Sequence, residues 1–168
     1  MKKNWSLTLL LLTLSLGCID VIAQEKQRMD ENKGIIGEYY VDDLPVIVKL
    51  VNELPNKSTI EKLPFLTVVS WKYDGSANNG MPPAEINERM IVLEDSLVSS
   101  ISKSNKFLHA YSRTGNNLKE FLYYSTSQVE FMNMLNKTLE KHDVYPIEIN
   151  FYEDPTWSEF KKLLSDFN

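Results

Sequence analysis

The sequence predicts an α+β protein in which helices pack against an antiparallel sheet. Residues 65–73 carry the first observation, because their apolar side chains occupy both alternating faces, as in a strand covered on both sides. A long amphipathic helix follows, with apolar residues spaced by three and four positions. Two strands, a second helix and a further strand complete the series, which indicates one mixed domain.

Two short strands are expected before this series. Residues 38–41 and 46–51 have strand composition, and the intervening residues 42–45 predict a turn, so the two strands form a hairpin. Residues 52–63 are interpreted as a loop with one helical turn. Residues 74–80, rich in Gly, Asn and Ser, predict a flexible loop after the main strand.

The first long helix follows a pair of prolines. Pro82 and Pro83 suit a first helical turn, where missing N–H groups cost nothing. Its buried face is expected to carry Ile86, Met90, Leu93, Leu97 and Ile101. Its solvent side is expected to carry Glu85, Glu88 and Glu94.

The second half of the series begins with a hairpin. Residues 106–112 and 118–126 predict its strands, with a turn at residues 114–117. The first strand is expected to place Phe107, His109 and Tyr111 on one face.

A second helix is expected to follow this hairpin directly. Ser127 and Glu130 form a capping box that starts it at Gln128. Its buried face is expected to carry Val129, Met132, Leu135 and Leu139.

The chain is expected to end in a strand and a short helix. Residues 145–152 alternate between apolar and polar side chains. Asp154 is expected to cap the last helix, with Pro155 at its first position. The apolar stripe of this helix is Trp157, Phe160 and Leu164.

From residue 65 the order is strand, helix, strand, strand, helix, strand. This order is the split β-α-β plan of ferredoxin-like domains, and the crossover rule places both long helices on one face of an antiparallel sheet. The N-terminal hairpin and the short C-terminal helix are additions to that plan. We therefore predict one domain over residues 38–168, preceded by a linker over residues 24–37.

The first 23 residues are predicted to be a signal peptide. Lys2 and Lys3 precede an uncharged, leucine-rich stretch at residues 7–17, which is too short to span a bilayer. Cleavage after Ala23 is the favoured prediction, and lipidation of Cys18 is the alternative. The protein is thus expected to be exported and periplasmic or secreted, with an outer-membrane lipoprotein as the alternative.

Composition narrows the classes of function. The formal net charge is −5 and the acidic residues are scattered, so nucleic-acid binding is not expected. The single cysteine excludes an intramolecular disulfide bond and a thiolate metal cage. No His-x-x-x-His or Glu-x-x-His spacing occurs, so neither a metal nor another cofactor is expected.

No catalytic constellation stands out among the polar residues. His142, next to Asp143, and His109 are interpreted as structural, and Arg89 and Arg113 as members of surface salt bridges. A candidate interaction patch consists of Trp71, Tyr73, Met81, Pro82, Asp154 and Trp157. Exposed aromatic and methionine side chains at one end of the sheet would bind a partner, whereas the competing interpretation places them in the core or at a helix cap.

Several segments resemble one bacterial family, named domain of unknown function 695. They are Val68-Val69-Ser70-Trp71-Lys72-Tyr73, Gly80-Met81-Pro82, Leu93-Glu94-Asp95, the Thr114-Gly115 hairpin with residues 121–124, Tyr145-Pro146-Ile147 and Asp154-Pro155-Thr156-Trp157-Ser158. The family is distantly like the protein regulator of ribonuclease E. The resemblance implies a binding or regulatory module, although that nuclease is cytoplasmic and this chain is expected to be exported.

The sequence therefore predicts a non-enzymatic protein-interaction or regulatory module with an unknown protein partner. Contact with a membrane is expected only through the signal peptide or a lipid on Cys18. The alternative is a small-ligand-binding protein or a hydrolase that uses a cleft near Gly80 and Asp154.

Overall fold

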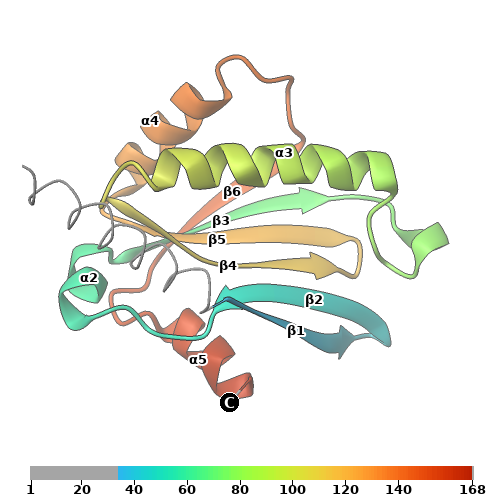
Figure 1. Cartoon of the computed structure of the whole chain (residues 1–168), viewed down its shortest axis with the longest axis horizontal. Coiled ribbons are helices and arrows are strands. Elements are labelled where there is room, and N and C mark those ends of the chain that lie inside the picture. The colour runs from blue at the N-terminus through green and yellow to red at the C-terminus, as the bar shows by residue number, and fades with distance from the viewer. Residues whose placement is uncertain (1–33, 168) are drawn as a thin grey trace, which may run out of the picture. The chain divides into compact units, whose positions relative to one another are not determined.

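The computed structural model describes residues 34–167 and builds them around one six-stranded sheet (Figure 1). The strands are β1 (Gly34–Val41), β2 (Leu44–Val51), β3 (Phe65–Lys72), β4 (Phe107–Gly115), β5 (Leu118–Ser125) and β6 (Ile147–Glu153). The helices are α2 (Lys57–Lys62), α3 (Ala84–Ile101), α4 (Gln128–Leu139) and α5 (Ser158–Asp166), with a 3₁₀ turn, η1 (Ser76–Asn78). The α+β prediction is confirmed. The predicted signal peptide, Cys18 and residues 24–33 of the predicted linker lie outside the described residues.

The strands follow the order β1-β2-β4-β5-β3-β6, so β1 and β6 form the edges of the sheet. β3 pairs antiparallel with β5 on one side and with β6 on the other, as expected for the strand that is apolar on both faces. β2 pairs antiparallel with β4 and joins the N-terminal hairpin to the rest of the sheet.

Two turns set the register of the hairpins. Asp42 and Asp43 have φ values of 51° and 63°, and Asn116 and Asn117 have φ values of 46° and 64°. Two successive residues with positive φ are typical of type I′ turns, whose twist matches that of the flanking strands. Gly115, with a φ of 151°, leaves room for the carbonyl of Pro45 on β2, which a Cβ atom would strike.

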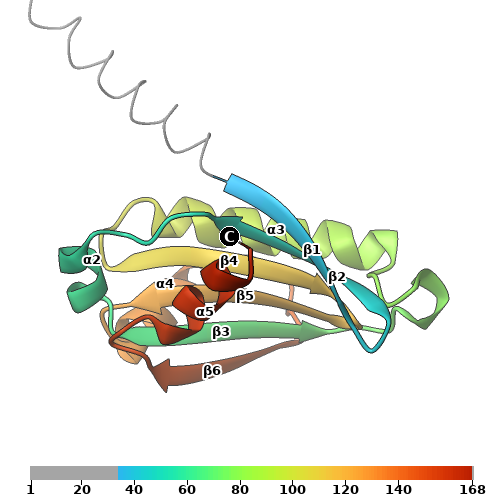
Figure 2. The same cartoon turned by 90° about the horizontal axis from the view of Figure 1, so that it is seen from below.

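The sheet is covered on both faces. Helices α3 and α4 lie on one face and α5 lies on the other (Figures 1 and 2). The alternation of β3 divides its side chains between the two cores, because Val69 and Trp71 face α3 and α4 while Leu66 and Val68 face α5. Each core thus receives one face of the strand.

A β-bulge overturns the predicted face of the strand at residues 106–112. The pairing of β4 with β5 shifts between His109 and Tyr111, so two residues of β4 occupy the place of one. Phe107 therefore packs in the α3/α4 core, whereas Tyr111 packs in the α5 core. The prediction that these residues share a face was wrong because a bulge reverses the alternation.

Both long helices depart from the predicted pattern at single positions. Glu94 is only 8% exposed, although it was expected on the solvent side of α3. It turns inward because Lys119, on β5, provides a buried charge partner. On α4, Phe131 occupies the core and Val129 is 69% exposed, so the buried face is rotated from the predicted one.

Smaller differences concern the ends of elements. β1 begins at Gly34, four residues before the predicted strand. α5 begins at Ser158, so Pro155 precedes the helix instead of occupying its first position. On α3, Pro83 is the N-cap and the helix begins at Ala84.

Candidate functional site

The six residues of the predicted interaction patch do not lie together. Trp71 is buried in the α3/α4 core and Trp157 in the α5 core, so the two indoles occupy opposite faces of the sheet. Trp71 pairs with Ile147 at the start of β6, whereas Asp154 follows the end of that strand. The prediction of one common patch was wrong because antiparallel pairing places these residues at opposite ends of β3.

At the Trp71 end of β3, the loop before α3 is held by hydrogen bonds. The Tyr73 hydroxyl donates to the carbonyl of Gly80 at 3.0 Å, and Asn117 Oδ1 accepts from the Gly75 N–H at 2.8 Å. Desolvation raises the pKa of Tyr73 to about 12, so its hydroxyl stays protonated. Met81 is half-buried and Pro82 is buried, so these members of the predicted patch are largely structural.

Arg89 also has a structural role at this end. Its guanidinium lies 5.5 Å from the ring centroid of Trp71 and 5.7 Å from that of Tyr145. It donates a 3.1 Å hydrogen bond to the carbonyl of Val144. His142 Nδ1 lies 2.9 Å from the hydroxyl of Tyr145, so this histidine is also tied to a neighbour.

At the opposite end, Asp154 fastens α5 to the sheet. Its Oδ1 accepts from the backbone N–H and the hydroxyl of Ser158, both at 2.7 Å. Its Oδ2 accepts from the hydroxyl of Tyr124 at 2.7 Å and from the N–H of Glu159 at 3.1 Å. Burial opposes ionisation, but these hydrogen bonds outweigh it and hold the pKa of Asp154 below its usual range. Trp157 occupies the N-cap position that was predicted for Asp154, but the Asp154 carboxylate still accepts from the first N–H groups of α5. A carboxylate with such a low pKa is a poor general base.

A second buried polar cluster lies beneath α3. Glu94 accepts hydrogen bonds from Lys119 Nζ at 2.9 Å and from Ser112 Oγ at 3.3 Å. Burial opposes its ionisation, but Lys119 prevails and lowers the pKa of Glu94. His109 lies nearby and packs against Tyr123, with ring centroids 4.9 Å apart. Desolvation lowers the pKa of His109 to about 4, so the imidazole is neutral at pH 7.

The open part of the molecule lies beside α5, on the face opposite α3 and α4. Two adjacent cavities there have volumes of about 370 and 530 Å³, and both are lined by Arg113 and Glu159. We call them together the α5 groove. A third cavity of about 190 Å³ also reaches Arg113, from the side of β1 and β2.

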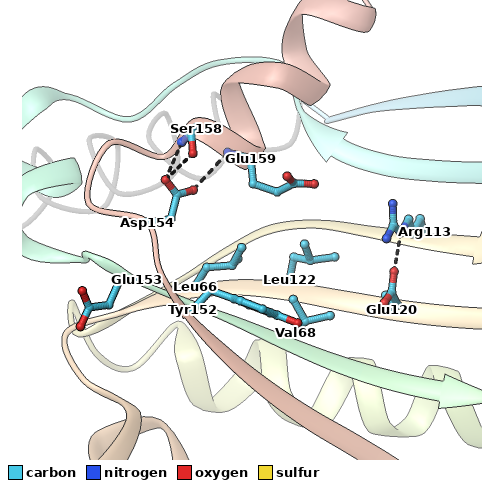
Figure 3. A pocket seen from close by; sticks show the side chains of 10 residues that line it. All are labelled: Leu66, Val68, Arg113, Glu120, Leu122, Tyr152, Glu153, Asp154, Ser158 and Glu159. Atoms are coloured by element: carbon cyan, nitrogen blue, oxygen red, sulfur yellow. Dashed lines mark hydrogen bonds and ion pairs between the residues drawn. The ribbon is translucent and has the colours of Figure 1, made fainter.

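The smaller cavity of the α5 groove has an apolar floor and a charged rim (Figure 3). Leu66, Val68 and Leu122 form the floor, and Glu159 reaches in from α5. The larger cavity lies between α5 and the strands β1 and β4, where Tyr39, Tyr111 and Phe167 supply aromatic surface. Its rim carries the carboxylates Glu38, Glu159 and Asp166 and the cations Arg113 and Lys162.

Arg113 occupies the centre of the groove and is already paired. Its Nε donates to Glu120 Oε2, and the other oxygen of Glu120 accepts from Ser70 Oγ at 3.1 Å. Burial opposes its charge, but Glu120 raises the pKa of Arg113, so the pair stays ionised. Arg113 forms the predicted salt bridge, but its partner Glu120 is buried, so the pair does not lie on the surface as predicted. Because this pair is neutral as a whole, the other carboxylates determine the charge of the groove.

The sequence analysis did not predict the α5 groove, although it could have predicted the pairing of Arg113 with Glu120. A two-residue turn at Asn116 and Asn117 requires Arg113 to face Glu120 across the hairpin, which is the register observed. The larger cavity is lined by β1, β4 and α5, and the smaller one by β3, β4, β5, β6 and α5. These elements are far apart in sequence, and no local pattern indicates that they meet. Gly80 and Asp154, which the sequence analysis assigned to one cleft, lie at opposite ends of β3, and Asp154 lines the smaller cavity of the groove.

Among residues 34–167, no group of three or more His, Cys, Asp or Glu side chains is arranged to hold a metal ion. No helix in the described part is long and apolar enough to cross a membrane. A family model described as "Family of unknown function (DUF695)" matches residues 39–165. No curated protein matches the chain.

Proposed function

From the geometry of this chain, which belongs to the family of unknown function DUF695, we propose that it is a non-enzymatic protein-interaction or regulatory module. It binds its partner in the α5 groove. The observation that carries this proposal is the pair of adjacent cavities, of about 370 and 530 Å³, that open along one flank of α5. A groove with an apolar floor and a polar rim is the general form of a peptide- or ligand-binding surface.

The chemistry of the lining favours binding over catalysis. The residues that line the two cavities include carboxylates, hydroxyls, a guanidinium and an ammonium group, but neither histidine nor cysteine. The Ser158 hydroxyl is committed to Asp154, and Asp154 already accepts four hydrogen bonds. These hydrogen bonds hold the pKa of Asp154 below its usual range, so this carboxylate is a poor base for activating the Ser158 hydroxyl, as acyl transfer would require.

We also propose the ferredoxin-like assignment for the portion from β3 to β6. Its support is the strand order β4-β5-β3-β6, with α3 and α4 together on one face. On this assignment, the β1–β2 hairpin, α2 and α5 are additions, and β1 and α5 form much of the wall of the larger cavity. The proposed binding surface thus combines strands of the common plan, which form its floor, with elements added to that plan.

Export remains part of the proposal, supported by the order of charged, apolar and small residues over positions 1–23. Mass spectrometry of the mature protein checks it. A chain that starts at Gln24 supports cleavage by signal peptidase I, whereas a lipid on Cys18 supports the lipoprotein alternative. An intact Met1 contradicts both.

Site-specific photo-crosslinking in the native host tests the proposed surface. A photoreactive residue replaces Tyr152, which is 53% exposed at the groove, and in a matched control it replaces Val129, which is 69% exposed on α4. We expect one discrete crosslinked protein from position 152 and none from position 129. Equal products at both positions, or turnover of a substrate that is lost in Asp154→Ala, would contradict the proposal.

A further inference from the structure

We propose that the larger cavity of the α5 groove receives the basic side chain, arginine or lysine, of a segment of the partner protein. This inference rests on the proposed function and specifies its chemistry. The cavity of about 530 Å³ combines aromatic walls with carboxylates at the rim, and this combination recognises organic cations in proteins.

The charge of the cavity favours a cation. The carboxylates Glu38, Glu159 and Asp166 line it, against the cations Arg113 and Lys162. Arg113 is paired with Glu120, which lies outside this cavity, so its charge is already balanced. Three carboxylates therefore face one remaining cation, and a bound ammonium or guanidinium group would offset half of this excess negative charge.

The position of Asp166 supports a role in binding. It is the last residue of α5, where a negative charge opposes the helix dipole. Helix stability therefore does not explain an acidic residue at this position. Asp166 and Glu159 both line the cavity, and both are exposed to solvent. They present two carboxylates along one flank of the helix.

The aromatic residues complete the fit. Tyr111 is buried and its hydroxyl lies 3.5 Å from Glu159 Oε1, so it holds this carboxylate at the cavity wall. Tyr39 and Phe167 form an edge-to-face pair with ring centroids 6.4 Å apart. The aliphatic stem of a lysine or arginine can pack on these rings while its charged end reaches the carboxylates.

A partner segment can continue from this cavity into the smaller one. The two cavities share Arg113 and Glu159, and the floor of the smaller one is apolar. A segment with a basic residue next to aliphatic residues would therefore match both parts of the α5 groove.

Fluorescence anisotropy with labelled peptides tests the inference. The probe is a ten-residue peptide of alternating arginine and valine, and its counterpart replaces arginine with glutamate. We expect the basic peptide to bind and the acidic peptide not to bind. The E159Q/D166N variant should bind the basic peptide about tenfold more weakly, because two charge-assisted contacts are lost.

The matched control is E85Q/E88Q, which removes the same charge from exposed positions on α3, on the opposite face of the sheet. It should bind like the wild type. An equal loss in both variants would mean non-specific attraction and would overturn the inference, as would binding of the acidic peptide. Tighter binding of spermine than of the basic peptide would also overturn it, in favour of a small cation.

The two proposals can fail separately. If the photo-crosslink at position 152 forms but E159Q/D166N leaves it unchanged, the groove binds a partner without using the proposed cation site. If no crosslink forms at position 152, the proposed function fails, whatever the peptides do.

Discussion

Asp154 and Tyr124 form the joint between α5 and the sheet. The Tyr124 hydroxyl donates a 2.7 Å hydrogen bond to Asp154 Oδ2, and the Tyr124 ring stacks on Trp157 with centroids 3.7 Å apart. Trp157 in turn donates from its indole nitrogen to the carbonyl of Leu63 at 2.9 Å. The Asp-Pro-Thr-Trp-Ser element, one of the segments on which the family resemblance rests, therefore has a structural role between α5 and the sheet.

Replacing Asp154 should destabilise the packing of α5 on the sheet. Asp154→Ala leaves the Tyr124 hydroxyl, the Ser158 hydroxyl and two helix N–H groups without their acceptor, so we expect a loss of about 2–4 kcal/mol in the free energy of unfolding. Urea denaturation measures it. Because folding lowers the pKa of Asp154, its contribution is present above the unfolded pKa and is lost as the pH falls through the folded pKa. Asp154→Ala should therefore be less sensitive to acid than the wild type in this range.

Trp157 should matter through packing. Its side chain is fully buried against Tyr124 and Phe160, so Trp157→Ala should cost about 3–5 kcal/mol. Trp157→Phe keeps an aromatic ring and should cost less, although it removes the hydrogen bond to the Leu63 carbonyl. Thermal unfolding followed by near-ultraviolet circular dichroism compares the two variants. Equal costs would show that stacking contributes little.

His109 should make the domain sensitive to mild acid. Its folded pKa of about 4 lies below the unfolded value, so its neutral form stabilises the fold above pH 6.5, and this contribution is lost as the pH falls from 6.5 towards 4. At pH 4 this loss amounts to about 3 kcal/mol in the free energy of unfolding. Glu94, Lys49 and Lys119 act electrostatically on this imidazole.

The His109→Phe variant isolates this effect from the carboxylates that titrate in the same range. Urea unfolding at pH 7 and pH 4 should show a smaller loss of stability for the variant than for the wild type. An NMR titration of His109 with a midpoint near 6.5 would contradict the prediction.

The buried pair of Lys119 and Glu94 should show strong coupling. Their side chains are 8% and 10% exposed, so Lys119→Met leaves a buried carboxylate with only the exposed Lys49, 3.8 Å away, as a counter-charge. We expect a loss of about 3 kcal/mol in the free energy of unfolding. The double variant Lys119→Met/Glu94→Gln should recover much of this loss, because no uncompensated charge remains. A double-mutant cycle from chemical denaturation measures the coupling, and additive losses would rule it out.

Local patterns identified most of the elements. Three of these patterns depend only on neighbouring residues, and the structure agrees with each of them. They are the apolar residues on both faces of β3, the capping serine of α4 and the apolar face of α3. The predicted faces of β4 and α3 were wrong where residues far apart in sequence contact each other. The bulge after His109 reverses one face of β4, and Lys119 draws Glu94 inward.

The candidate site was much harder to predict. Trp71, Tyr73, Asp154 and Trp157 were selected for their chemical character, yet three of them are buried and Tyr73 is half-buried. Residue type does not report burial, because the same aromatic side chain suits a core or an interface.

The sequence by itself determined the class of fold, the order of its main elements and the place of Asp154 at the start of α5, because spacing and capping act within a few residues along the chain. Only the tertiary structure decided where the surface remains open. The α5 groove exists because α5 covers part of its sheet face and because Tyr39, Arg113 and Glu159 come from separate elements. Such a juxtaposition depends on long-range packing, which no local periodicity encodes.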